Sequence, residues 1–171
     1  MASAGSQAAA LGGFIARIEG EPHRAHVTFR LSAGLGGEGL TCEVPVRHHA
    51  LTVDEPKSIG GGDLGPNPVE VALAALAGCQ AITYRLWAAK LGVRVDRIEV
   101  DVEGDMDVRG YVGMEDAVRP GPGAVRLRVR LEGPEPPERY RALAEAADAH
   151  CPLLDFTANP VPVERVLDLG G

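Results

Sequence analysis

The feature that most constrains the fold is a long apolar stretch that begins "NPVEVALAALAGCQAITYRL". Asn67 is a favourable N-cap, Pro68 suits the first position of a helix, and Glu70 completes a capping box. The helix that starts here is expected to end at Gly92, because glycine readily adopts the backbone that closes a helix. Its first half is apolar on every side, and a helix of this kind must be surrounded by protein.

Apolar residues at every second position predict strands on either side of this helix. The expected strands lie within residues 24–32, 40–56 (one or two strands), 93–108, 124–133 and 159–169. A second helix is expected over residues 136–151, with Leu143, Ala147 and Cys151 on its apolar stripe, and Pro152 then disfavours further helix. This order predicts an α+β fold in which antiparallel sheets pack around the long central helix and the second helix.

A thin sheet cannot cover a helix that is apolar on every side. We therefore expect a second copy of the chain to bury the remaining apolar surface of the helix in a homodimer. The chain has 171 residues, of which 45% are hydrophobic and only 4% aromatic, so it can build one aliphatic core. Residues 1–13 lack the cationic start and sustained apolar core of a secretory signal. They are expected to form a flexible tail, followed by a single domain over residues 14–171.

Charge and hydropathy argue against two classes of partner. The formal net charge is −7, and no basic cluster with interleaved aromatic residues is present, so nucleic-acid binding is not expected. The longest purely apolar run is far shorter than the ~20 residues that a membrane span needs, so no membrane contact is expected. The expected location is the cytoplasm.

The chain has three cysteines, Cys42, Cys79 and Cys151, at wide spacings and with no CxxC pair. This pattern argues against a secreted disulfide scaffold and against a zinc site. The histidines form no HxxxH pattern, so no metal site is predicted. Trp87 and Tyr84 flank the second half of the long helix. Packing is the preferred role for both, and lining an apolar substrate pocket is the alternative.

Two of these thiols face inward from the two main helices and could meet in space. The alternative is that Cys79 and Cys151 both simply fill the core. If they meet, the available chemistry is thiol redox, in which a thiolate attacks a peroxide, becomes a sulfenic acid and condenses with the second thiol. Burial raises a thiol pKa, and a position in the middle of a helix does not lower the pKa of Cys79 as a helix N-terminus would. A cation, best an arginine, must therefore be brought to it.

The sequence "GPNPVEVALAALAGCQAITY", followed 72 residues after Cys79 by "CPLLDFTANPVPV", resembles the OsmC/Ohr family, and the upstream "RHHALTVDEP" adds to the likeness. The resemblance extends from about residue 41 to the end of the chain. It implies an intertwined α+β homodimer with active sites at the subunit interface. It also implies reduction of organic hydroperoxides by cysteine chemistry without a cofactor, with regeneration by a dithiol such as protein-bound lipoamide.

The resemblance assigns roles to four residues. Cys79 matches the peroxidatic cysteine and Cys151 the resolving one, while Arg47 is the candidate for the activating arginine and Glu70 for the acid that orients it. The hydroperoxide-resistance branch has its acid directly after Asn-Pro, where this chain has Val69, so Glu70 could be only the capping residue. This departure points to the broader OsmC-like branch.

Helix geometry adds a constraint on the acid. Nine residues separate Glu70 from Cys79, which is about 13–14 Å along a helix, so Glu70 would serve the Cys79 of a partner. The expected function is a thiol peroxidase that reduces organic hydroperoxides to alcohols through a Cys79–Cys151 disulfide. The alternatives are a non-enzymatic binding protein for an apolar ligand and a disulfide-switched redox sensor.

Overall fold

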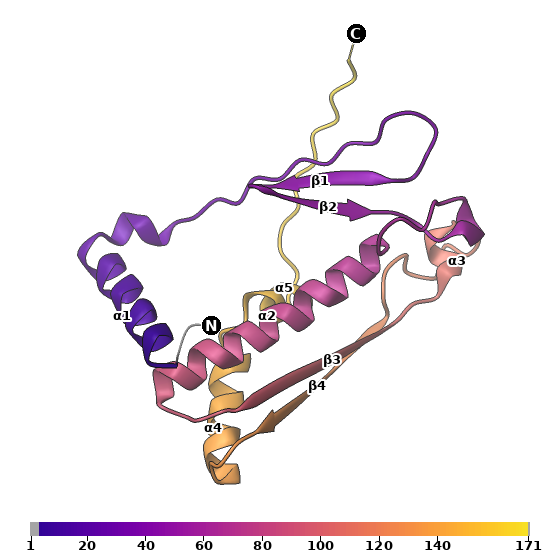
Figure 1. The fold of residues 1–171 in the computed structure, drawn as a ribbon. Helices are drawn as coiled ribbons and strands as arrows, with labels where there is room; N and C mark the ends of the chain where they lie inside the picture. The colour runs from indigo at the N-terminus through magenta and orange to yellow at the C-terminus, as the bar shows by residue number, and fades with distance from the viewer. Residues whose placement is uncertain (1–3, 171) are drawn as a thin grey trace.

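The computed structural model describes residues 4–170, which form helices and two small sheets (Figure 1). The helices are α1 (Ala4–Gly20), α2 (Pro68–Leu91), α3 (Val108–Tyr111), α4 (Pro137–Asp148) and α5 (Pro152–Ala158), with single 3-10 turns at Pro22–Ala25 and Lys57–Ile59. The strands are β1 (Cys42–Val46), β2 (His49–Val53), β3 (Arg97–Asp105) and β4 (Ala124–Glu132). Mixed helices and small antiparallel sheets confirm the coarse fold class predicted from the sequence.

Both sheets are two-stranded and antiparallel. In the first, β1 and β2 form a hairpin in which Val46 pairs with His49 across a two-residue turn. In the second, β3 and β4 pair along their whole length, and the outward-facing Arg126 and Arg130 form ion pairs with acidic residues of β3. The arginine-rich face of β4 is therefore a structural, solvated face, as its alternation with Val and Leu indicates.

The long helix α2 begins and ends where its capping residues predict. The side chain of Asn67 accepts a hydrogen bond from the backbone N–H of Glu70, and the Glu70 carboxylate accepts one from the N–H of Asn67. At the other end, Gly92 closes the helix with a left-handed backbone of φ 61°. Both ends are fixed by contacts within four residues, which is why the sequence alone predicts them.

The main core lies where α2 meets α4 and the β3–β4 sheet. Its fully buried members are Tyr84, Ala88, Val93, Val95, Leu143 and Ala147. Leu143 and Ala147 lie on the predicted apolar stripe of the second helix, and both are buried. Apart from Tyr84, these members are aliphatic, in keeping with the low aromatic content of the chain.

Two predicted strands do not form. Residues 27–33 and 159–170 are irregular, and the side chains of Phe29 and Val163 are 85% and 86% exposed. Figure 1 shows the C-terminal segment running away from the rest of the chain. Both segments have the alternation of strands, but no strand of the described chain lies beside them to accept their backbone hydrogen bonds.

Two other segments are helical where helix was not expected. Residues 4–13, expected to form a flexible tail, belong to helix α1, whose N-terminal half is rich in alanine, the strongest helix former; residues 1–3 lie outside the described residues. The expectation that Pro152 prevents further helix is also wrong, since Pro152 occupies the first turn of α5. Proline is well tolerated there because its missing N–H would have no helical partner.

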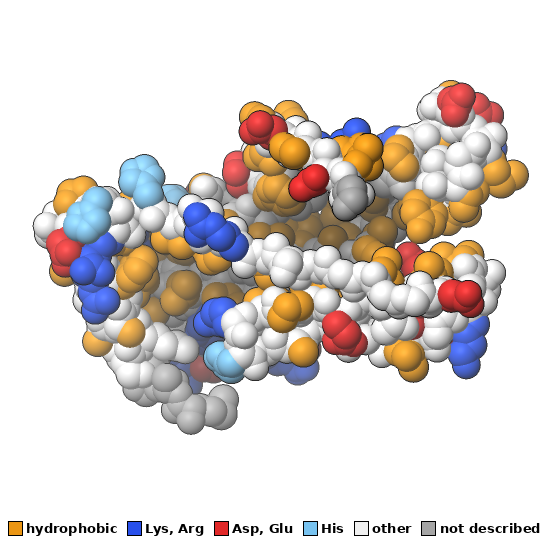
Figure 2. All heavy atoms as spheres, turned by 90° about the horizontal axis from the view of Figure 1, so that it is seen from above, with side chains coloured by type: hydrophobic (Ala, Val, Ile, Leu, Met, Phe, Trp, Pro, Cys, Tyr) orange, Lys and Arg blue, Asp and Glu red, His pale blue; other side chains and the backbone are white. Residues whose placement is uncertain are grey.

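Helix α2 is covered on one side only, so its expected burial all round is not found in the single chain. Ala74, Ala75 and Gly78 are exposed, and Ile82 is 63% exposed. Figure 2 shows hydrophobic side chains gathered in a hollow of the face seen from above. Among the described residues, α2 alone is long and apolar enough to cross a membrane, a test that rests on length and composition and that core helices of globular proteins also pass.

A candidate active site built on two cysteines

Two thiols that are 72 residues apart in the sequence lie side by side in the structure. The Sγ of Cys151 is 3.5 Å from the Sγ of Cys79, and both cysteines are unbonded thiols. Cys79 comes from the middle of α2, whereas Cys151 lies in the turn between α4 and α5, at the N-cap of α5. The turn at residues 149–151 thus follows the end of α4 and places Cys151 against α2.

The two thiols differ in access. Cys151 is buried, with 1% of its surface exposed, whereas Cys79 is partly exposed. Cys79 lines a cavity of about 580 Å³ together with Ala75, Gly78, Ile82, Thr83, Leu86, Trp87, His150, Pro152 and Leu153. Most of these side chains are apolar, so an uncharged organic molecule can reach Cys79 while Cys151 stays shielded behind it.

The environment of Cys79 works in both directions on its ionisation. Burial raises the pKa of the Cys79 thiol above its usual value, and the neighbouring Cys151 adds to the increase. Hydrogen bonds to the sulfur from the backbone N–H of Leu153 and from the Thr83 side chain oppose this increase without reversing it. In the single chain, Cys79 is therefore a neutral thiol. The two hydrogen-bond donors beside its sulfur would stabilise a thiolate if one formed.

His150 and Trp87 form one wall of the same cavity. Their rings lie 4.3 Å apart between centroids, and the Nζ of Lys90 lies 4.1 Å from the centroid of the Trp87 ring. The Nδ1 of His150 lies 2.8 Å from the carbonyl oxygen of Ala146, which favours the tautomer with its proton on Nδ1. Of the two roles considered for Trp87, the alternative of lining an apolar pocket is seen here, whereas Tyr84 is buried in the core.

The sequence pattern predicts few of the other residues that surround Cys79. Thr83 is one helical turn from Cys79, a spacing that could have indicated the contact. The N–H of Leu153 and the ring of His150 reach the site only because the chain turns at Cys151. Pro152 signals a break in the helix at this point, but not the direction in which the chain continues.

Arg47 and Glu70 are not brought to the thiols within one chain. Arg47 lies in the turn between β1 and β2, where its φ of 58° is in the left-handed region that glycine or asparagine usually occupies. Glu70 forms the capping box at the start of α2. Neither residue lines the Cys79 cavity, and within the described residues neither forms a hydrogen bond or ion pair with Cys79 or Cys151.

The glycine-rich loop before α2 is held by one buried carboxylate. Asp54, 1% exposed, accepts hydrogen bonds from the Thr41 hydroxyl and from the backbone N–H groups of Glu55, Gly62 and Leu64, at 2.8–3.2 Å. Burial opposes ionisation of Asp54, but these four donors together hold its pKa below the usual value. These hydrogen bonds hold the loop in place before α2. Its N–H groups are directed at Asp54 and do not form a phosphate-binding loop.

The site has no feature of a metal centre. In residues 4–170, no group of three or more His, Cys, Asp or Glu side chains is placed to hold a metal ion. What the arrangement offers is a pair of thiols, two hydrogen-bond donors and an apolar approach.

Comparison with known proteins agrees with this geometry. The model of the OsmC-like protein family matches residues 60–165, which include both thiols. No curated protein was found to match the chain.

Several solved structures share the fold at low sequence identity. An OsmC-like protein from Mycoplasma pneumoniae has a TM-score of 0.64 and 18% identity, covering 77% of this chain and 88% of its own. An organic hydroperoxide resistance protein OsmC from Legionella pneumophila has a TM-score of 0.54 and 18% identity, covering 76% and 90%. An organic hydroperoxide resistance protein from Elizabethkingia anophelis has a TM-score of 0.51 and 20% identity, covering 77% and 89%. With its family match over most of the chain, this protein belongs to the OsmC-like family.

Proposed function

We propose that the protein is a cysteine-based peroxidase that reduces organic hydroperoxides to alcohols. The observation that carries the proposal is the 3.5 Å approach of the Cys151 sulfur to that of Cys79, which lines an apolar cavity. Two of the structural relatives are described as organic hydroperoxide resistance proteins, which supports the same substrate class.

The difference in access sets the order of the two thiols. Cys79 faces the cavity and would attack the hydroperoxide, whereas Cys151 is shielded and would resolve the product. Apolar side chains around Cys79 favour a hydroperoxide with an organic group over hydrogen peroxide, because the organic group is removed from water on binding.

The proposed reaction has three steps. The Cys79 thiolate attacks the O–O bond and becomes a sulfenic acid, while the departing alkoxide takes up a proton and leaves as the alcohol. The Cys151 thiol then condenses with the sulfenic acid, forming the Cys79–Cys151 disulfide and releasing water. For this, the sulfurs must approach from 3.5 Å to about 2.05 Å, a small movement. An external dithiol, such as one carried on a lipoylated protein in the cytoplasm, finally reduces the disulfide and is itself oxidised to a disulfide.

Activation of Cys79 would need a second copy of the chain. Because burial raises the pKa of Cys79 within one chain, a cation must be supplied from elsewhere. We propose an intertwined homodimer in which Arg47, supported by Glu70, lies near the Cys79 of the partner. Three features favour it: the exposed apolar face of α2 and the two unpaired segments with strand alternation, residues 27–33 and 159–170.

One observation favours a second candidate. The raised pKa of Cys79 slows its reaction with peroxides, which favours a binding protein that uses the apolar cavity without turnover, because the cysteines of fast thiol enzymes and of redox sensors both have lowered pKa values. A disulfide-switched redox sensor that is oxidised once and slowly is the other alternative. Both share the Cys79 cavity with the proposed peroxidase but differ from it in rate.

The test is peroxide consumption by the reduced protein, measured by stopped flow with cumene hydroperoxide and with hydrogen peroxide in the presence of dihydrolipoamide. Multiple turnovers and a strong preference for the organic peroxide are expected. Cys79→Ser should abolish turnover, Cys151→Ser should stop after one sulfenic acid, and the matched control Cys42→Ser should behave as wild type. Full turnover by Cys79→Ser would refute the proposal, and a single slow oxidation of the wild type would favour the sensor.

A further inference from the structure

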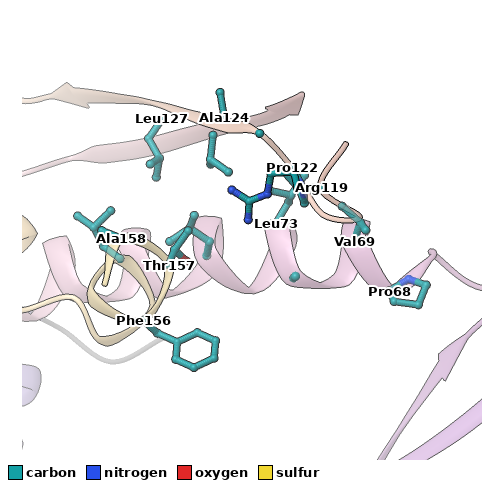
Figure 3. Close-up of a pocket in the computed structure, with 15 residues that line it drawn as sticks. Pro68, Val69, Leu73, Arg119, Pro122, Ala124, Leu127, Phe156, Thr157 and Ala158 are labelled. Carbon is teal, nitrogen blue, oxygen red and sulfur yellow. The ribbon is translucent and has the colours of Figure 1, made fainter. Parts of the chain in front are cut away.

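A second cavity lies on the other side of α5 from Cys79. It has a volume of about 580 Å³ and is enclosed by the first half of α2, the start of β4 and the second half of α5 (Figure 3). Leu153 of α5 faces the Cys79 cavity, whereas Leu154 and Thr157 line this second one. The helix α5 is therefore a shared wall, and the two cavities have no lining residue in common.

The lining of this cavity is apolar except at one place. Leu73 and Leu76 of α2, Leu127 of β4 and Leu154 of α5 supply aliphatic surface. No aspartate or glutamate is among the lining residues, and Arg119 is the one charged side chain among them. Figure 3 shows the Arg119 side chain extending from the connection before β4 into the space between α2 and the start of β4.

Arg119 is a cation without an anion. Within residues 4–170, its guanidinium forms no ion pair and no side-chain hydrogen bond. Three other arginines of the β3–β4 region differ: Arg109 pairs with Asp107, Arg126 with Asp105, and Arg130 with Asp101. Arg128 of β4 forms no ion pair within residues 4–170 either, but it does not line this cavity. An unpaired guanidinium beside a largely apolar cavity matches a molecule with a single anionic group and an aliphatic body.

We propose that this cavity binds an aliphatic carboxylate, with the carboxylate held by Arg119 and the chain lying along the leucines. The volume lies within the range of small-molecule sites. A planar guanidinium can hold both oxygens of a carboxylate at once, which a lysine cannot. The site is separate from the proposed peroxidase chemistry and does not depend on it.

The exposed face of α2 does not compete for this cavity. Gly78 is two residues from Leu76, about 200° around the helix, so the face that a second copy would cover points away from the cavity. The carboxylate site and the proposed dimer can therefore exist together in the same molecule.

The test is calorimetric titration of the full-length protein with decanoate and with 1-decanol as the uncharged match. Saturable binding of one decanoate per chain is expected, with 1-decanol bound about tenfold or more weakly, since a hydrogen-bonded charge contributes at least that much. Arg119→Gln should weaken decanoate binding by a similar factor, and Arg119→Lys should restore part of it. The control Arg128→Gln, on the solvated face of β4, should bind as wild type, as should Ile82→Ala, which alters the Cys79 cavity.

Several results would overturn the site. Equal binding of 1-decanol and decanoate would remove the role of the guanidinium. Loss of decanoate binding in Ile82→Ala but not in Arg119→Gln would place the ligand beside Cys79 instead. Dissociation of the protein into monomers by Arg119→Gln, with no decanoate bound by the wild type, would assign the cavity to a subunit interface.

Discussion

The hydroxyl of Tyr84 donates a hydrogen bond to the carboxylate of Asp148, at 3.1 Å, and this contact joins the second half of α2 to the last residue of α4. Asp148 is three residues before Cys151, so the bond fixes the end of α4 just where the chain turns to bring Cys151 onto α2. Burial, and then the nearby Asp148 carboxylate, raise the pKa of Tyr84, so the phenol stays protonated and remains a donor at neutral pH.

Tyr84→Phe removes this donor while keeping the ring in the core. We expect the free energy of unfolding to fall by about 1 kcal/mol, the usual contribution of one hydrogen bond. Urea denaturation of the reduced protein measures it. The matched control is Tyr111→Phe, whose side chain is exposed, and an equal loss in both variants would contradict the role given to Tyr84.

The Thr83 side chain is predicted to support the ionised form of Cys79. Thr83→Val removes a donor to the sulfur, so the pKa of Cys79 should rise further and the rate of alkylation by iodoacetamide at pH 8 should fall. The measurement is the alkylation rate against pH, with the label located by mass spectrometry. In the control Thr157→Val, whose hydroxyl bonds to the carbonyl of Leu153 instead, the Cys79 profile should not move.

The same raised pKa has a consequence for stability. The folded state holds the Cys79 proton more tightly than the unfolded state does, so stability decreases as the pH rises through the pKa of the unfolded thiol. Cys79→Ser removes this ionisation and should flatten the alkaline side of the stability profile. A wild-type profile as flat as that of Cys79→Ser would show that folding does not raise the pKa of the Cys79 thiol.

Contacts close in sequence were predictable, and those that join distant segments were not. The capping box of Asn67 and Glu70 and the closing Gly92 depend on neighbours within four residues. The alternation in residues 97–105 and 124–132 predicts their strands because one face of that sheet packs on α2 and α4. By contrast, the segment around Phe29 has the same alternation and no strand beside it within the chain.

The site shows the same division. The sequence indicates that Cys79 and Cys151 face inward, but the turn that closes the distance depends on how α4 ends and α5 begins. The position of Arg47 shows what the pattern cannot predict. Alternation indicates only that Arg47 lies next to a strand, whereas the structure places it in a turn with a left-handed backbone. No pattern in the sequence predicts that Asp54 collects four donors from two segments.

Asp54 is predicted to make the approach to α2 sensitive to acid. Its pKa is held below the usual value of an aspartate, so its contribution to stability is complete above the unfolded pKa of about 3.9 and is lost as the pH falls through the lower folded value. Asp54→Asn should lower the denaturation midpoint at pH 7 and lose less stability than wild type below about pH 5. The control Asp63→Asn, exposed and at a left-handed position that asparagine tolerates, should follow the wild-type curve.

The exposed face of α2 is predicted to be the dimer interface. Ile82 is a large apolar side chain on that face, and a charge placed there would be buried without a partner in the dimer. Ile82→Glu should raise the dissociation constant of the dimer about 100-fold or more, which sedimentation velocity over a range of concentrations can measure. Val112→Glu, at an apolar position just after α3 that is 54% exposed, is the control and should leave the dimer intact. A wild-type protein that stays monomeric at high concentration would contradict both the interface and the supply of Arg47 from a partner.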